Sequence, residues 1–127
     1  MATILLVEDN DDIREMMAVA LELGGYQVLS APNGRAALEA LGESPRPSLI
    51  LLDLMMPVMN GWEVCQILKA DPRFSDIPVV VVSAVTTEIA ERLAGTRLVP
   101  KPIDLDHLLD VVDEQCGLGF SGSSPGC

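Results

Sequence analysis

The sequence predicts an α/β domain in which helices cover both faces of a parallel sheet. Five short apolar runs alternate along the chain with five segments whose apolar residues recur at helical spacing, the pattern of a doubly wound sheet. A length of 127 residues suits one domain with a buried core. Hydrophobic residues make up 49% of the chain, which argues against disorder. No internal repeat or second domain is indicated.

The predicted strands cover residues 3–7, 26–30, 48–53, 78–83 and 96–99. The first and third are unbroken apolar runs, as expected of strands buried on both faces. The fourth is β-branched almost throughout, which favours a strand. The second is less apolar, so we expect it near an edge.

The predicted helices contain apolar faces within residues 13–21, 36–41, 64–68, 89–94 and 105–112. The second is expected to end at Gly42 and the third before Asp71-Pro72, while the fourth spans 87–94 and the fifth starts at Asp104. Asp12 and Glu15 resemble a capping box at the start of the first helix, although Asn10 or Asp11 could cap it instead. The pair Gly24-Gly25 is expected to end this helix. The glycine- and serine-rich residues 118–127 are predicted to form a flexible tail after a domain spanning residues 1–117.

Charge and cysteine content exclude several functions. The net charge of −11 argues against direct nucleic-acid binding, which relies on Lys and Arg at phosphates. No apolar run approaches the roughly 20 residues of a membrane span, and no signal peptide precedes the first strand. The three cysteines lack metal or redox spacing. We expect a reducing cytoplasmic location, with Cys65 and Cys116 packed as small hydrophobic residues.

Polar residues stand at the carboxyl ends of four of the predicted strands: Glu8 and Asp9, Asp53, Ser83, and Lys101. The carboxyl ends of parallel strands share one edge, so these groups can converge. Two carboxylates about 4 Å apart repel by about 4 kcal/mol at an effective dielectric constant near 20. A hard cation such as Mg²⁺ relieves this repulsion. With a lysine and a hydroxyl, the set could clamp a phosphoryl group at a carboxylate nucleophile.

Each residue also has a simpler interpretation. Asp53 could be a turn residue at a strand end, and the acidic run from Glu8 could only cap a helix. Ser83 could be an ordinary strand-end hydroxyl, and Lys101 a surface lysine. Their joint occurrence in this order favours a functional site.

The sequence resembles the receiver domain of two-component response regulators. The matching motifs are Val7-Glu8-Asp9-Asn10, Leu52-Asp53-Leu54-Met55-Met56-Pro57, Met59-Asn60-Gly61, Val82-Ser83-Ala84 and Lys101-Pro102. The resemblance extends from residue 1 to about residue 116. It implies a flavodoxin-like, three-layer (βα)5 sandwich with the parallel strand order 2-1-3-4-5.

The resemblance also implies a role for each site residue. Asp53 would be the phospho-acceptor. Asp9, Asp53 and the backbone carbonyl of Met55 would bind Mg²⁺, with Glu8 acting largely through metal-bound water. Ser83 and Lys101 would contact the phosphoryl oxygens. The Lys101-Pro102 bond would be cis. Such a domain is not a conventional enzyme, because it accepts a phosphoryl group and catalyses only its own phosphotransfer.

Two departures from the family concern signalling. Leu98 stands where the family has a switch aromatic residue, and the segment between Ser83 and Lys101 is a few residues short. These departures put the usual coupling between hydroxyl and aromatic residue in doubt.

We expect a stand-alone receiver, phosphorylated by a sensor histidine kinase or phosphotransfer protein, with output through protein–protein contacts because no output domain follows the last helix. A phosphorylation-independent interaction module is the alternative. A phosphohydrolase of the haloacid-dehalogenase type is disfavoured, because its second Asp is here Met55.

Overall fold

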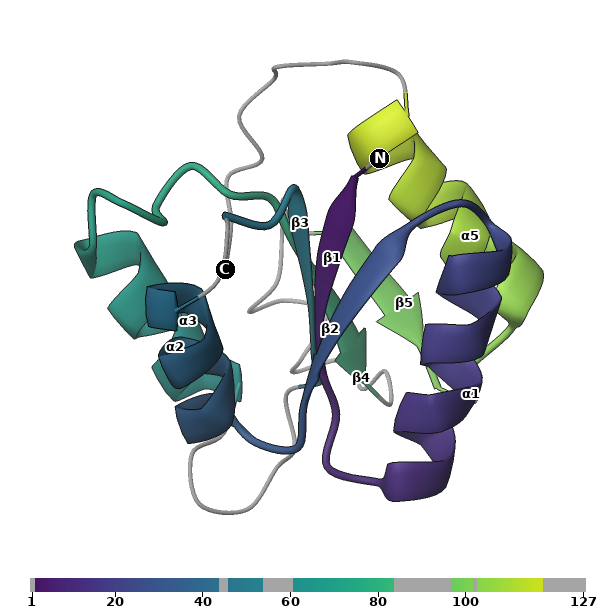
Figure 1. Ribbon diagram of the computed structural model, residues 1–127, viewed down its shortest axis with the longest axis horizontal. Coiled ribbons are helices and arrows are strands. Elements are labelled where there is room, and N and C mark those ends of the chain that lie inside the picture. The colour runs from purple at the N-terminus through teal and green to yellow at the C-terminus, as the bar shows by residue number, and fades with distance from the viewer. Residues whose placement is uncertain (1, 44–45, 54–60, 84–96, 102, 118–127) are drawn as a thin grey trace.

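The computed structural model describes residues 2–43, 46–53, 61–83, 97–101 and 103–117 of the chain (Figure 1). Its parallel sheet has the order β2-β1-β3-β4-β5. The strands are β1 (Thr3–Val7), β2 (Gln27–Ala31), β3 (Leu49–Asp53), β4 (Val79–Ser83) and β5 (Arg97–Pro100). The predicted fold class and strand order are therefore confirmed. The second to fifth strands each begin one residue later than predicted, and the second and fifth also end one residue later.

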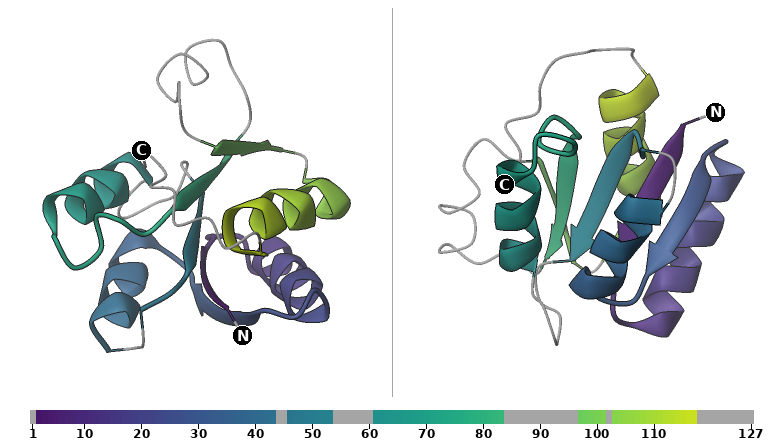
Figure 2. Two further views of the ribbon diagram at one scale, coloured as in Figure 1. Left: turned by 90° about the horizontal axis from the view of Figure 1, so that it is seen from above. Right: turned by 60° about the vertical axis from the view of Figure 1, so that its left-hand side comes forward.

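Helices pack on both faces of the sheet (Figure 2). They are α1 (Asp11–Leu23), α2 (Gly34–Glu43), α3 (Gly61–Ala70) and α5 (Leu105–Val112), and α5 continues into a π-helix, η1 (Asp113–Gly117). α1 and α5 cover one face, while α2 and α3 cover the other. The helix predicted over 87–94 and the tail predicted over 118–127 lie outside the described residues. In the part of the chain that is described, no helix has the length and apolar character needed to cross a bilayer.

The alternation of side chains along the central strands divides the core into two layers. Leu5, Ile50 and Val81 pack toward α2 and α3, whereas Leu6 and Leu51 pack toward α1 and α5. All five side chains are essentially inaccessible to water. This double burial explains why these strands read as continuous apolar runs.

Polar caps and a glycine turn fix where the helices begin and end. Asn10 caps α1, because its side-chain oxygen accepts a hydrogen bond from the Ile13 amide at 3.0 Å. Asp104 caps α5 in the same way. The chain leaves α1 through Gly25, whose φ of +97° suits glycine. Among the caps that the sequence left open for α1, the structure selects Asn10.

Cys65 corrects one expectation. Its side chain is buried between α3 and the sheet, as predicted. However, its sulfur takes part in a disulfide bond instead of carrying a free thiol. The partner is not among the described side chains. The odd number and wide spacing of the cysteines offered no basis for predicting a pair.

Candidate functional site

The strand register aligns the predicted site residues along one edge of the sheet. Val7 pairs with Leu52, so Glu8 and Asp53 occupy equivalent levels on β1 and β3. Ser83 ends β4 opposite Pro100, and the Lys101 amide donates to the Ser83 carbonyl at 3.0 Å. The backbone alone therefore places these groups at adjacent strand ends.

Three carboxylates gather at this edge. One oxygen from each of Glu8, Asp9 and Asp53 lies within 4.8 Å of the other two. Glu8 and Asp53 are only 1% and 2% exposed, whereas Asp9 faces solvent. Burying two acids side by side is costly unless a cation compensates them.

Lys101 supplies part of that compensation. Its Nζ lies 3.1 Å from Asp53 Oδ2 and 3.4 Å from Glu8 Oε1. Burial by itself lowers the pKa of Lys101, but hydrogen bonding and attraction to Asp53, followed by Glu8, outweigh it and raise that pKa. One ammonium therefore serves two buried carboxylates and stays charged.

Glu8 remains incompletely satisfied. Its Oε2 accepts a hydrogen bond from the Asn10 amide at 3.1 Å, but its buried Oε1 accepts none within the described part of the chain. Burial, opposed by the Asn10 amide and reinforced by Asp53, raises the pKa of Glu8 from 4.5 to about 7. Within the described residues, the Oε1 atom accepts no hydrogen bond and has the Lys101 ammonium only as an ion-pair partner at 3.4 Å. Beside two further carboxylates, it fits a bound cation with oxygen ligands such as Mg²⁺.

The remaining predicted residues are only partly described. Ser83 is buried at 1% exposure at the end of β4. Leu98 is half-buried on β5 and packs against the core on the α2 and α3 side. Met55 and Pro102 lie outside the described residues, as does the isomer of the Lys101-Pro102 bond. The roles assigned to the site residues stay predictions at this point.

Arg14, a residue of α1 that belongs to none of the predicted site motifs, also reaches this edge. Its guanidinium donates to the backbone carbonyl of Glu8 at 2.9 Å and pairs with Asp11 at 2.5 Å. The spacing from Asp11 indicates only an ordinary pair along an exposed helix face. No local signal shows that the side chain turns back onto the preceding strand end.

Comparison with known proteins identifies one family. Residues 4–113 match the family model described as the response regulator receiver domain. The chain is 35% identical over 114 residues to the DNA-binding dual master transcriptional regulator RpaA of Synechocystis, covering 86% of this chain and 46% of RpaA. It is 46% identical over 82 residues to the phosphate regulon regulator PhoB of Pseudomonas aeruginosa, covering 65% and 35%. The chain thus spans less than half the length of these relatives.

Solved structures give the same result. The receiver domain of a signal transduction histidine kinase from Syntrophus aciditrophicus superposes with a TM-score of 0.85 at 30% identity, covering 98% of this chain and 96% of the other. The chemotaxis protein CheY4 of Vibrio cholerae superposes with a TM-score of 0.80 at 27% identity, covering 90% and 98%.

Proposed function

The chain belongs to the receiver domains of response regulators, and on this premise we propose that Asp53 accepts a phosphoryl group from a sensor histidine kinase or a phosphotransfer protein. Receiver domains are signalling domains rather than conventional enzymes. The proposal adds that this domain catalyses its own phosphorylation. The observation that carries it is the position of Lys101, whose ammonium lies between the buried Asp53 and Glu8 carboxylates.

Glu8, Asp9 and Asp53 would hold Mg²⁺, together with the backbone carbonyl of Met55. The support for the three carboxylates is their mutual proximity and the unsatisfied Glu8 oxygen, whereas the part of Met55 rests on resemblance to the family. Glu8, with one oxygen on the Asn10 amide, would act mainly through metal-bound water. When bound, Mg²⁺ would offset the negative charge of the incoming phosphoryl group.

The protein side chains would carry the transfer itself. The Asp53 carboxylate attacks phosphorus, an aspartyl phosphate bond forms, and the bond from phosphorus to the donor imidazole nitrogen breaks with its electron pair left on nitrogen. The Lys101 ammonium, at 3.1 Å from Asp53, would stabilise the negative charge on the phosphoryl oxygens. The Ser83 hydroxyl would donate to one of those oxygens.

The direct test is phosphoryl uptake from acetyl phosphate with Mg²⁺, followed by intact-protein mass spectrometry. We expect a gain of one phosphoryl group in the wild type and none in Asp53→Asn. Asp76→Asn is the matched control, because Asp76 is an exposed aspartate paired with Arg46 away from the site. Lys101→Ala should slow uptake by about tenfold or more, since it removes the charge that faces the transferred group. No gain in the wild type, or an equal gain in Asp53→Asn, would overturn the proposal.

We further propose that the receiver domain spans residues 1–117 and works in the cytoplasm, where a kinase can supply the phosphoryl group. Its output would be a contact with another protein. The name of one longer relative, RpaA, states DNA binding, but the net charge of −11 opposes a direct contact between this chain and phosphate backbones.

A second candidate is a receiver-like module that binds its partner whether or not it is phosphorylated. Leu98 favours this candidate, because a half-buried aliphatic side chain packed on the core has no ring to swing between two positions. The phosphoryl mimic beryllofluoride separates the two candidates. Partner affinity or oligomeric state that does not change with the mimic would support the module.

A further inference from the structure

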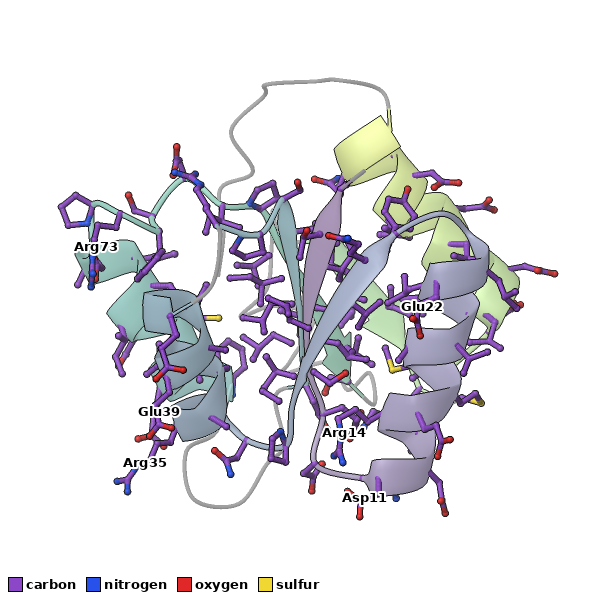
Figure 3. The ribbon with its side chains drawn as sticks, viewed as in Figure 1. Asp11, Arg14, Glu22, Arg35, Glu39 and Arg73 are labelled. Carbon is purple, nitrogen blue, oxygen red and sulfur yellow. The ribbon has the colours of Figure 1, made fainter. Side chains whose placement is uncertain are left out.

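The side chain of Arg14 crosses from α1 to the strand end that carries two of the acidic residues. Figure 3 shows it between α1 and the end of β1, with Asp11 at the start of the same helix. Only 20% of the Arg14 side chain is exposed, against 85% for Asp11. Because ion pairs with exposed partners contribute little to stability, the pair with Asp11 does not by itself account for the burial of Arg14.

Among the described residues, Arg14 has two partners, and one of them is the peptide that joins the acidic residues. One guanidinium nitrogen donates to the Glu8 carbonyl at 2.9 Å, and the other pairs with Asp11. The Glu8 carbonyl belongs to the peptide unit linking Glu8 to Asp9. Its orientation therefore fixes the directions in which both carboxylates leave the backbone.

Other bonds hold the same short loop, so Arg14 completes a set of restraints. The Glu8 amide donates to the Ala31 carbonyl of β2 at 3.1 Å, and the Asn10 amide donates to Glu8 Oε2 at 3.1 Å. Neither of these two bonds uses the Glu8 carbonyl, which accepts its hydrogen bond from the Arg14 side chain. A neutral or shorter side chain would weaken or remove this restraint on the peptide.

We propose that Arg14 is a positioning residue that orients the Glu8–Asp9 peptide and thereby sets the affinity of the acidic cluster for Mg²⁺. This inference rests on the proposed function, in which those carboxylates hold the ion. Groups that orient metal ligands typically change metal affinity by about 10- to 100-fold when they are removed. Arginine suits the task because its planar guanidinium can serve the carbonyl and Asp11 at once.

In Arg14→Gln, the loss of charge and the loss of orientation predict opposite changes in Mg²⁺ affinity. Arg14→Gln makes the protein more acidic and would by charge alone tighten Mg²⁺ binding. Loss of orientation weakens it instead. We expect the dissociation constant, measured by calorimetry on the full metal-free chain, to rise by about tenfold. Arg14→Lys keeps the charge but loses the planar fork. Its dissociation constant for Mg²⁺ should lie between those of Arg14→Gln and the wild type.

Two matched variants serve as controls. Arg73→Gln removes an arginine that also pairs with a nearby aspartate, Asp71, but on the opposite side of the molecule (Figure 3). Asp11→Asn removes the ion pair of Arg14 while leaving its bond to the Glu8 carbonyl. Both should bind Mg²⁺ within about twofold of the wild type. A change in Asp11→Asn as large as in Arg14→Gln would assign the effect to the ion pair and overturn the inference.

A readout without metal completes the test. Amide hydrogen exchange at Asn10 should speed up in Arg14→Gln and not in Arg73→Gln, because the Asn10 amide bonds to the Glu8 side chain that Arg14 helps to orient. If Arg14→Gln showed unchanged exchange at Asn10 and also bound Mg²⁺ as tightly as the wild type or more tightly, the role of Arg14 would be overturned. The proposed function would still stand as long as the wild type takes up a phosphoryl group. A wild type that neither binds Mg²⁺ nor takes up a phosphoryl group would overturn the proposed function as well.

Discussion

At the scale of single residues, Glu8 is a strongly perturbed acid. It is essentially buried, one of its oxygens accepts no hydrogen bond within the described residues, and its pKa is raised to about 7. Lys101 at 3.4 Å compensates only part of this cost, because the same ammonium also faces Asp53. The metal-free protein therefore keeps an incompletely compensated carboxylate in its core, which is the condition that favours cation binding.

The raised pKa predicts how the stability of the metal-free protein depends on pH. The folded state holds the Glu8 proton more tightly than the unfolded state, whose pKa is near 4.5. The contribution of Glu8 is thus complete below about pH 4.5 and is lost as pH rises through about 7, by at most about 3 kcal/mol. Denaturant unfolding at pH 5 and pH 8 in a chelator would measure this loss.

Glu8→Gln should remove most of that decline, because its amide does not titrate. Glu39→Gln is the control, since Glu39 lies exposed on α2 (Figure 3) and should leave the pH dependence unchanged. The burial account of the site would be wrong if Glu8→Gln and the wild type lost the same free energy of unfolding between the two pH values.

At the scale of elements, two glycines with open surroundings play opposite roles. A methyl group added at Gly25 or at Gly42 would meet no atom within 4 Å. Gly25 has a φ of +97° where the chain leaves α1, whereas Gly42 lies within α2. The effect of a substitution at either position thus comes from the backbone alone.

Gly25→Ala should therefore destabilise the protein by about 1 kcal/mol, because alanine resists the left-handed conformation. Gly42→Ala should stabilise it by about 0.5–1 kcal/mol, because alanine favours a helix. Chemical denaturation of both variants measures the two changes in the free energy of unfolding. Changes of the same sign would show that the backbone conformation of one of the two glycines is described wrongly.

At the scale of the whole molecule, acidic residues dominate a chain of net charge −11. The cluster of Glu8, Asp9 and Asp53 concentrates part of this charge at one edge of the sheet. A divalent cation can act there in two ways, by binding at the cluster or by screening all surface charges.

Binding predicts that Mg²⁺ stabilises the wild type by mass action, by about 2.7 kcal/mol at a concentration 100 times the dissociation constant. NaCl at matched ionic strength should give a much smaller rise in melting temperature, because it only screens. Asp53→Asn should lose most of the Mg²⁺-specific part. Equal stabilisation by both salts would point to screening and against a metal site.

How far the sequence predicts the structure differs between the elements. The buried strands were predicted to within a residue, because burial on both faces leaves an unbroken apolar signal in Leu49–Asp53 and Val79–Ser83. The strand at the sheet edge, Gln27–Ala31, was displaced by one residue at both of its ends, since its half-exposed side chains give a weaker pattern. The start of α1 stayed open among several acidic or amide residues until the structure selected Asn10.

The sequence by itself determined the fold class and the residue types at the strand ends, because both follow from local periodicity and from the direction of parallel strands. Only the tertiary structure decided the burial of Glu8, the distances from Lys101 to its two carboxylates, the disulfide bond of Cys65 and the contact of Arg14 with the Glu8 carbonyl. These features depend on how side chains distant in sequence, or turned back across a loop, meet in space. No local pattern of residues records that geometry.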